Sequence, residues 1–564
     1  MTSRTSFFNG AILKKNLTRF APVWILYTVG LMIAYPLYLS SNFLANLEGG
    51  MHYLRMLTGY GGTVANFGAA VVIAACCFKY LYQTRSAYML HAFPVTRGSL
   101  FRTNLFSGLL MGTVPMLAAL STCALTAIMY GYPAVEVFDC IGLYVLQFLF
   151  FYGLAVFCMH LAGQLVSAVL LYGTLNFLAI GLELLIRAIL EPMMYGYVNN
   201  GYYTLRFSPL VAIMTGMGTF QYGYLGILAG VGVVLLVLSW LLYRKRRMET
   251  CGEFIAYRSA RPVFQYLFTL VVTLLLGLIL SLIVYGDIDL LSTHAVGTVF
   301  CMLVAAFIGL FVAEALLNKS LRVFRGKTFA KYGLFALLLA TTLAAFRCDW
   351  FGIVSYVPDP SKVASVSISP NGCTYPLTLS EQEDIARVTE LHALFTESRT
   401  SYYNGEVHLS YKLKNGRTVT RKYPVTDEMY TGSAAYEASQ ELLTLLQEPR
   451  FSVEYYESIK LEEAHYVDLE YLVYHEQDGY YATSEYISLN SAEQAKLREM
   501  LLADAADGNL SVSCAGGSYY RYGPDCDYVY NISFGFLGRG NAWISIPAEA
   551  EATVAYLDTL IPSE

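Results

Sequence analysis

An apolar run that ends in four cations constrains the fold of this chain more than any other feature. Residues 224–243 contain no charged side chain, and the next four residues are Arg244, Lys245, Arg246 and Arg247. A helix that is apolar on every side fits a bilayer rather than the surface of a soluble domain. Cations at its end indicate the cytosolic side, because they are costly to translocate and are attracted to anionic lipid headgroups. Residues 244–249 are therefore expected to form a cytosolic anchor, ending at Glu249, at the end of a membrane helix.

Composition and charge divide the chain into two unlike parts. Of its 564 residues, 56% are hydrophobic and 14% are charged, whereas about a quarter of a soluble protein is charged. Residues 1–350 hold 23 Lys and Arg against 11 Asp and Glu, but residues 351–564 hold 14 against 31. We therefore expect a basic membrane part that carries an acidic, water-soluble domain, with the boundary near Trp350.

Nine segments reach or approach the roughly 20 apolar residues of a membrane-spanning helix. They are residues 20–39, 61–78, 105–130, 141–161, 165–189, 224–243, 263–285, 296–317 and 332–346. The expected fold is an all-α polytopic membrane domain of about nine transmembrane helices, followed by a soluble α+β domain. Its expected parts are a six-span core (1–250), three additional helices (251–350) and the acidic domain (351–564).

The positions of the cations predict the orientation of these helices. With a cytosolic N-terminus, 19 of the 23 cations in residues 1–350 fall in cytosolic segments, and the opposite orientation reverses this bias. Nine spans then place the acidic domain outside the cytoplasmic membrane, whereas loss of the ninth would place it inside. Residues 7–20 are expected to form an interfacial amphipathic helix, or else an extension of the first span.

The acidic domain alternates between strand and helix patterns. Strands are expected at 363–369, 407–413, after the turn Asn415-Gly416, and at 466–474, 480–489, 528–534 and 542–546. Helices are expected after Ser380, at 434–446, from Asn490 to Ala506, and before Leu560. The order of these elements indicates two related halves. The loop 191–223 is rich in Tyr, Gly and Met, and we expect it to be ordered against the bundle or the acidic domain.

No catalytic, cofactor-binding or metal-binding motif stands out, and nothing indicates binding of nucleic acid. Gly326-Lys-Thr328 has Leu321 where a phosphate-binding loop needs its first glycine, so we interpret it as a cationic loop. The histidines of the acidic domain show no metal-ligand spacing. Cys514 and Cys526 are expected to pair only if this domain is extracytoplasmic.

Four ionisable residues lie inside or at the ends of the apolar segments. Glu183 and Arg187 stand four residues apart, the favourable order for a helical ion pair, and His160 and Glu314 lie near predicted inner ends. Because burying such groups is costly, they indicate either a polar substrate path or gate, or self-satisfied structural pairs.

The loop Pro94-Val-Thr-Arg97 and the segment 243–249, with Gly252, resemble permease subunits of bacterial type-2 ABC exporters. The resemblance is to the Ytr-type permeases, which have extra spans and an extracytoplasmic domain. It implies a non-catalytic subunit in the bacterial cytoplasmic membrane, surrounded by lipid and paired with a second permease copy or a homologous permease. It also implies that the loop between the second and third spans docks on a separate ATPase subunit. The coupling residues implied are Arg85, Met89, Phe93, Pro94, Arg97 and Arg102.

Other function classes fit parts of the same sequence. One is a membrane-anchored sensor or envelope-assembly protein whose extracytoplasmic domain binds a ligand or partner. Nine spans with intramembrane charges exceed what anchoring requires, which favours a transporter. Another is an integral-membrane enzyme, but no catalytic constellation supports it. Co-purification with a soluble ATPase separates the transporter from the sensor.

Overall fold

The computed structural model describes the chain as two compact units. The residues that it describes are 8–37, 57–92, 95–129, 135–198, 201–215, 222–286, 294–370, 375–397, 405–425, 434–475, 481–512, 528–536 and 540–561. The first unit contains residues 1–189, 201–286 and 296–340, and the second contains residues 190–200, 287–295 and 341–564.

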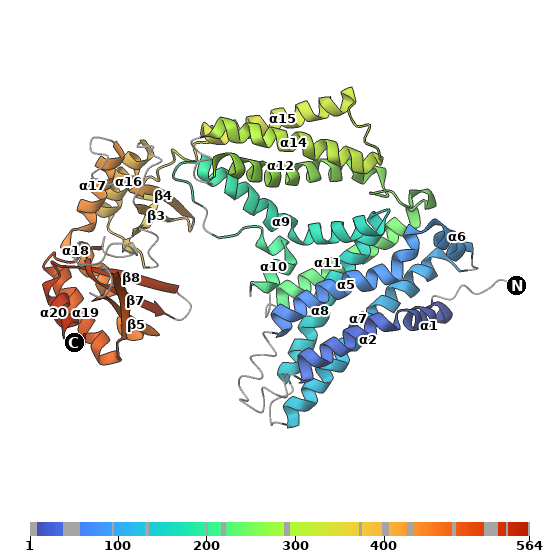
Figure 1. Cartoon of the computed structure of the whole chain (residues 1–564), viewed down its shortest axis with the longest axis horizontal. Helices are drawn as coiled ribbons and strands as arrows, with labels where there is room; N and C mark the ends of the chain where they lie inside the picture. The colour runs from blue at the N-terminus through green and yellow to red at the C-terminus, as the bar shows by residue number, and fades with distance from the viewer. Residues whose placement is uncertain are drawn as a thin grey trace. The chain divides into compact units, whose positions relative to one another are not determined.

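The first unit is built from helices (Figure 1). In chain order the helices that precede the sheets are α1 (Gly10–Arg19), α2 (Ala21–Met32), α5 (Gly62–Phe78), α6 (Thr84–Ala92), α7 (Arg97–Met129), α8 (Val135–Leu161), α9 (Leu165–Met193), α10 (Pro209–Met214), α11 (Tyr222–Lys245), α12 (Arg261–Tyr285), α14 (Ala295–Asn318) and α15 (Gly326–Arg347). Short turns of other helix types adjoin them: η1 (Ile33–Leu37), η2 (Leu57–Gly61), η3 (Lys79–Tyr82), η4 (Leu205–Phe207), η5 (Met248–Thr250) and η6 (Arg258–Ala260).

Eight helices of the described chain are long and apolar enough to cross a bilayer, and the pair α1 and α2 makes a ninth if it counts as one span. This agrees with a polytopic helical part. Helices α1 and α2 meet at a bend of 61°, so residues 10–19 form a helix of their own. The last of the expected membrane helices is longer than its apolar run in the sequence, because α15 has 22 residues. This is about 33 Å at 1.5 Å per residue, which matches a hydrocarbon core of about 30 Å.

Helix α8 packs against α5, α7 and α11. Its Gly153 lies so close to α11 that an added Cβ would stand 2.5 Å from the carbonyl oxygen of Gly232. Small residues at such crossings let helix backbones approach within a bilayer, where packing drives helix association. Phe148, Phe151 and Tyr152 of α8 are fully buried in the surrounding apolar cluster. These helices therefore form one packed body.

Helices α12, α14 and α15 pack against one another as a separate layer of the first unit (Figure 1). A Cβ on Gly277 of α12 would stand 2.9 Å from the Met302 side chain of α14. The Tyr332 ring of α15 meets the Phe307 ring of α14 edge to face at 5.5 Å. These three helices thus have packing contacts of their own.

The second unit contains two four-stranded antiparallel sheets. Its strands are β1 (Val363–Pro370), β2 (Leu377–Leu379), β3 (Gly405–Leu413), β4 (Thr418–Val425), β5 (Tyr466–His475), β6 (Tyr481–Ser488), β7 (Tyr528–Phe536) and β8 (Gly540–Pro547). Its helices and short turns are η7 (Pro360–Lys362), α16 (Gln382–Glu397), α17 (Ala434–Leu446), α18 (Pro449–Ser458), η9 (Leu461–Glu463), α19 (Ser491–Ala506) and α20 (Glu551–Asp558). This confirms an α+β arrangement after the apolar helices.

The two sheets share one topology. Their strand orders are β2-β1-β3-β4 and β6-β5-β7-β8, so each half pairs its first and third strands at the centre. Within each half a helix joins the two hairpins and packs on the helix that follows them, α16 on α17 and α19 on α20. The structure therefore confirms two related halves at the level of topology.

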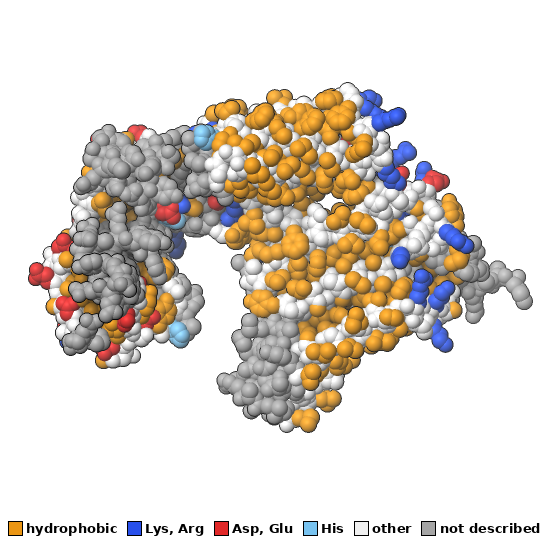
Figure 2. Space-filling model, viewed as in Figure 1, with side chains coloured by type: hydrophobic (Ala, Val, Ile, Leu, Met, Phe, Trp, Pro, Cys, Tyr) orange, Lys and Arg blue, Asp and Glu red, His pale blue; other side chains and the backbone are white. Residues whose placement is uncertain are grey.

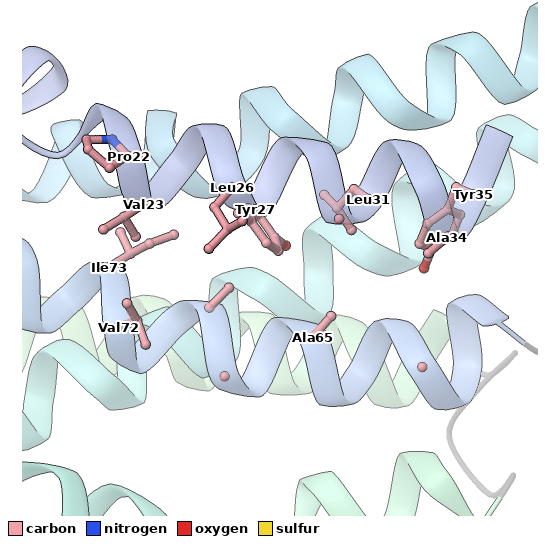
Figure 3. Close-up of a pocket in the computed structure, with 14 residues that line it drawn as sticks. Pro22, Val23, Leu26, Tyr27, Leu31, Ala34, Tyr35, Ala65, Val72 and Ile73 are labelled. Atoms are coloured by element: carbon pink, nitrogen blue, oxygen red, sulfur yellow. The ribbon is translucent and has the colours of Figure 1, made fainter. Parts of the chain in front are cut away.

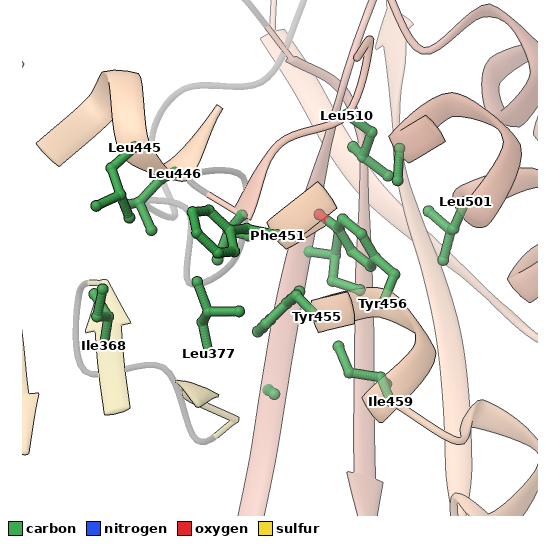
Figure 4. Packing of buried hydrophobic residues seen from close by; sticks show 14 of the residues in the cluster. Ile368, Leu377, Leu445, Leu446, Phe451, Tyr455, Tyr456, Ile459, Leu501 and Leu510 are labelled. Carbon is green, nitrogen blue, oxygen red and sulfur yellow. The ribbon is translucent and has the colours of Figure 1, made fainter. Parts of the chain in front are cut away.

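A single apolar cluster joins these halves (Figure 4). Helix α18 supplies Phe451, Tyr455 and Tyr456, all fully buried, between residues of the first sheet such as Leu377 and residues of α19 such as Leu501. Helix α18 was not among the expected helices, because Pro449 follows the helix 434–446 closely and proline often marks the end of a helix. Proline is also favoured in the first turn of a helix, and here it begins α18. The capping box between Asn490 and Glu493 is present as expected.

The segment 194–197 docks on the outer strand of the first sheet. Tyr197 forms an antiparallel bridge with Arg421 of β4, and the Lys422 amide donates to the carbonyl of Gly196 at 3.1 Å. The ring of Tyr195 packs on Tyr423, with 5.7 Å between centroids. This part of the loop 191–223 is therefore ordered against the acidic domain, one of the two expected positions.

Candidate functional site at the cation-rich end of the helical unit

Lys and Arg side chains gather at one end of the first unit, whereas its flanks are apolar (Figure 2). The segments at this end include α1, α6, the end of α11 and the connection between α14 and α15. Exposed cations here include Lys14, Arg85, Arg97, Arg244 and Lys327. A cationic end is typical of the cytosolic side of a membrane protein.

The implied coupling loop forms the short helix α6, which follows Gln83 in an extended conformation. Arg85 is exposed, and so are Tyr88 and Met89 at 59% and 54%. Phe93 and Pro94 lie outside the described residues. Exposed apolar side chains on so short a helix need a covering partner, which can be lipid or another protein.

Helix α7 begins directly after this loop. Thr96 accepts a hydrogen bond of 3.2 Å from the Ser99 amide, which is the helix cap expected of a threonine here. Arg97 in the first turn is exposed, and Arg102 one turn later is half-buried. The structure thus places Arg85, Met89, Arg97 and Arg102 at the same end of the unit.

Helix α1 is fixed to the start of α7. The Asn9 amide donates to Thr103 at 3.1 Å, and the Asn16 side-chain amide donates to Asn104 at 2.7 Å. The Phe8 and Phe106 rings meet at 5.3 Å. These contacts hold α1 beside the loop that precedes α7.

Arg246 differs from the other cations of its run, because it is buried. Arg244, Lys245 and Arg247 are exposed, as expected of an anchor, but only 6% of Arg246 is exposed. Its guanidinium donates to the carbonyls of His160 at 3.0 Å, Met159 at 3.3 Å and Leu81 at 3.5 Å. The carbonyls of His160 and Met159 belong to the last turn of α8, where no residue of the helix itself can donate to them. A cation at this position also offsets the helix dipole.

The chain beyond Arg247 returns to the turn between α8 and α9. Gly252 donates to the Gly163 carbonyl at 2.7 Å, and Ala256 donates to Leu161 at 3.0 Å. An added Cβ on Gly163 would stand 2.3 Å from the carbonyl oxygen of Glu253, so this position requires glycine. Glu249 is exposed beside this connection.

His160 lies in an aromatic cage and has a structural environment. It is fully buried, its Nδ1 is 2.7 Å from the Val156 carbonyl, and its Nε2 has no hydrogen-bond partner among the described residues. The rings of Phe78, Phe101 and Tyr243 surround it at centroid distances of 4.8, 5.3 and 5.6 Å. No polar path reaches it among these contacts.

Glu183 organises a surface loop together with Arg187. One carboxylate oxygen accepts from the Tyr203 amide at 3.0 Å and also pairs with Arg187, and the other accepts from the Thr204 amide at 2.7 Å. Arg187 donates to the Gly201 carbonyl and lies over the Tyr202 ring, 4.8 Å from its centroid. Among the described residues, the polar contacts of this pair go to each other and to the loop, which favours the structural interpretation.

Glu314 connects the three added helices near their cationic end. Lys331 of α15 lies 3.1 Å from its Oε2, and the same Lys331 donates to Gln265 of α12 at 3.1 Å. Gln265 in turn donates to Glu314, and Asn318 one helical turn later donates to it at 3.0 Å. This network joins α12, α14 and α15.

The described residues contain no group of three or more His, Cys, Asp or Glu that could hold a metal ion. The eight cysteines in the described ranges are free thiols. Cys514 and Cys526 lie outside those ranges.

No family model, curated protein or solved structure matches this chain. The site is therefore defined by its own geometry. The sequence did not predict the burial of Arg246. The helical phase of α11 could have indicated it, because Ser239, Tyr243 and Arg246 follow the spacing of the buried face of that helix.

Proposed function

We propose that this chain is the membrane-spanning, non-catalytic subunit of an ATP-driven transporter, and that it works as an exporter. In this proposal a separate ATPase subunit docks at the cation-rich end, which faces the cytosol. A second permease copy or a homologous permease completes the transport path. The acidic second unit lies on the opposite side of the cytoplasmic membrane.

Helix α6 is the observation that carries the proposal. It places Tyr88 and Met89 on the surface at the cationic end, between two membrane-length helices. A soluble partner that covers α6 would remove this apolar surface from water. The rigid attachment of α1 to α7 and the capping of α8 by Arg246 give a docked partner a firm connection to the bundle.

Co-purification tests this proposal. The full-length chain is isolated with a mild detergent, and its partners are identified by mass spectrometry. We expect a soluble subunit with a nucleotide-binding motif, and we expect Tyr88→Glu to release it by placing a charge in the contact. Leu321→Glu is the matched control, because Leu321 is 86% exposed in the connection between α14 and α15. If no ATPase is bound, or if Tyr88→Glu leaves the ATPase bound, the assignment is wrong.

The docking of residues 194–197 on β4 favours a second candidate. In a membrane-anchored sensor, the acidic domain binds a ligand or partner. A change in the position of β4 on binding then reaches the end of α9 through the contact of Tyr197 with Arg421. Protease treatment of intact cells tests the topology that both candidates share. Cleavage of the acidic domain before lysis is expected, whereas cleavage only after lysis would place it in the cytosol.

A further inference from the structure

We propose that one anionic phospholipid binds between α1–α2 and α5–α6, with its phosphate among three cations and an acyl chain in an apolar groove. The structure contains a polar pocket and an apolar groove that follow one another along α5, the pocket beside α1 and the groove beside α2. This inference rests on their geometry, and it is independent of the ATPase.

The polar pocket has a volume of about 560 Å³ and lies where α1, the end of α5, α6 and the start of α7 meet. Lys15, Arg19 and Lys79 line it, together with side-chain amides such as those of Asn9 and Gln83. None of its lining residues is acidic. The structure gives these three cations no ion pair within the described ranges. The pocket therefore offers positive charge and hydrogen-bond donors to an anion.

The apolar groove begins next to this pocket and has a volume of about 790 Å³. It lies between α2 and α5, where Val23, Leu26 and Tyr27 face Val72 and Ile73 (Figure 3). Along α5 the lining changes from Ile73 in the groove to Cys76 in the pocket within one helical turn. At the start of α2 the corresponding change is from Pro22 in the groove to Phe20, which precedes the helix, in the pocket.

The length of the groove fits an acyl chain. Its lining on α5 and the end of η2 extends from Ile73 to Gly61, which is about 18 Å at 1.5 Å per residue. One leaflet of the hydrocarbon core is about 15 Å deep. A headgroup in the pocket therefore lies at the interface when the chain fills the groove, and α1 is bent by 61° away from α2 at this level.

A lipid satisfies both parts of this surface, whereas a second copy that docks through the same surface offers less. The cations need an anion at the interface, and residues 1–135, which include all that line both cavities, contain a single acidic residue, Glu48. Anionic lipids attract such cations by about 1 kcal/mol each, or about fivefold in affinity. The charge of the pocket therefore favours an anionic lipid over a zwitterionic one.

The glycines of the groove give clean test variants. A Cβ on Gly68 of α5 or on Gly30 of α2 would meet no atom within 4 Å, so leucine at either position fills the groove without displacing the protein. Leucine also favours the helical state over glycine. Gly226→Leu is the matched control, because Gly226 of α11 has equally open space and lines neither cavity.

Native mass spectrometry of the purified full-length chain provides the test, with phosphatidylglycerol, phosphatidylcholine or inorganic phosphate added. We expect one retained phosphatidylglycerol, about fivefold weaker retention in Arg19→Gln, and loss of retention in Gly68→Leu and Gly30→Leu. Gly226→Leu and Lys245→Gln are expected to bind as the wild type does. Equal retention of phosphatidylcholine, displacement of the lipid by inorganic phosphate, or unchanged binding in the groove variants would overturn the proposal. It is also overturned if the wild type retains no lipid and the groove variants separate a dimer into monomers.

Discussion

The guanidinium of Arg246 donates a 3.0 Å hydrogen bond to the carbonyl of His160, so the end of α11 caps the end of α8. Arg246 belongs to a run of four cations, of which the other three, Arg244, Lys245 and Arg247, are exposed. One member of that run has thus become part of the packed interior. The connection fixes two neighbouring helices at the end where we propose that a partner docks.

Replacement of Arg246 by methionine should destabilise the chain strongly. Met keeps much of the apolar stem but removes the Arg246 donor from the His160 carbonyl, while the Met159 carbonyl keeps the Tyr82 hydroxyl as its donor at 2.7 Å. The expected cost is about 2–4 kcal/mol. The measurement is thermal unfolding of the purified full-length chain. Arg247→Met is the control, because Arg247 is exposed, and it should change the unfolding temperature little. Equal effects of the two variants would contradict a structural role for Arg246.

The docking of residues 194–197 should depend on Gly196. This residue has φ +74°, and an added Cβ would stand 2.4 Å from the Tyr423 ring. Gly196→Ala should therefore cost backbone strain and a steric clash, about 2–4 kcal/mol together. Gly201→Ala separates the two effects, because Gly201 has φ +87° and open space around its Cβ position. Limited proteolysis near residue 197 should increase in Gly196→Ala alone, and similar proteolysis of both variants would exclude the clash.

Many features of the fold follow from local patterns in the sequence. Length and apolarity were sufficient for the membrane-length helices, and alternation with turn residues such as Gly416 predicted every strand of the two sheets except β2. With three residues, β2 is too short to show alternation. The helix 434–446 was predicted with its observed ends, because its apolar spacing stops before a proline.

The remaining features depend on contacts between residues far apart in the chain. In the sequence, Arg246 is one cation among four, and its burial depends on the carbonyls that α8 provides. Tyr197 shows no strand pattern, because it forms a single bridge to β4. The pocket among Lys15, Arg19 and Lys79 likewise requires the bend between α1 and α2. No local pattern records these juxtapositions.

His392 should make the stability of the second unit depend on pH. Burial lowers its pKa to about 3, and the nearby Arg421 adds to this effect. The unfolded chain takes up a proton below about pH 6.5, whereas the folded chain does so only near pH 3. The contribution of His392 to the free energy of unfolding is therefore complete above about pH 6.5. It decreases by about 1.4 kcal/mol for each pH unit below that value.

Urea unfolding of the full-length chain between pH 4 and pH 7 measures this slope. His392→Phe keeps a ring beside Tyr411, with which His392 stacks at 5.3 Å, and should reduce the slope. His465→Gln changes an exposed histidine and should leave the slope as it is. A slope that is the same in His392→Phe and the wild type would show that His392 does not cause it.

The central claim is that α6 contacts an ATPase subunit, and site-specific photo-cross-linking in living cells tests it most directly. A photoreactive amino acid replaces Tyr88 in one variant and Leu321 in the other, since both side chains are exposed at the cationic end. The account predicts that position 88 captures a subunit with a nucleotide-binding motif and that position 321 does not. Capture of that subunit equally from both positions, or capture only of lipid from position 88, would contradict it.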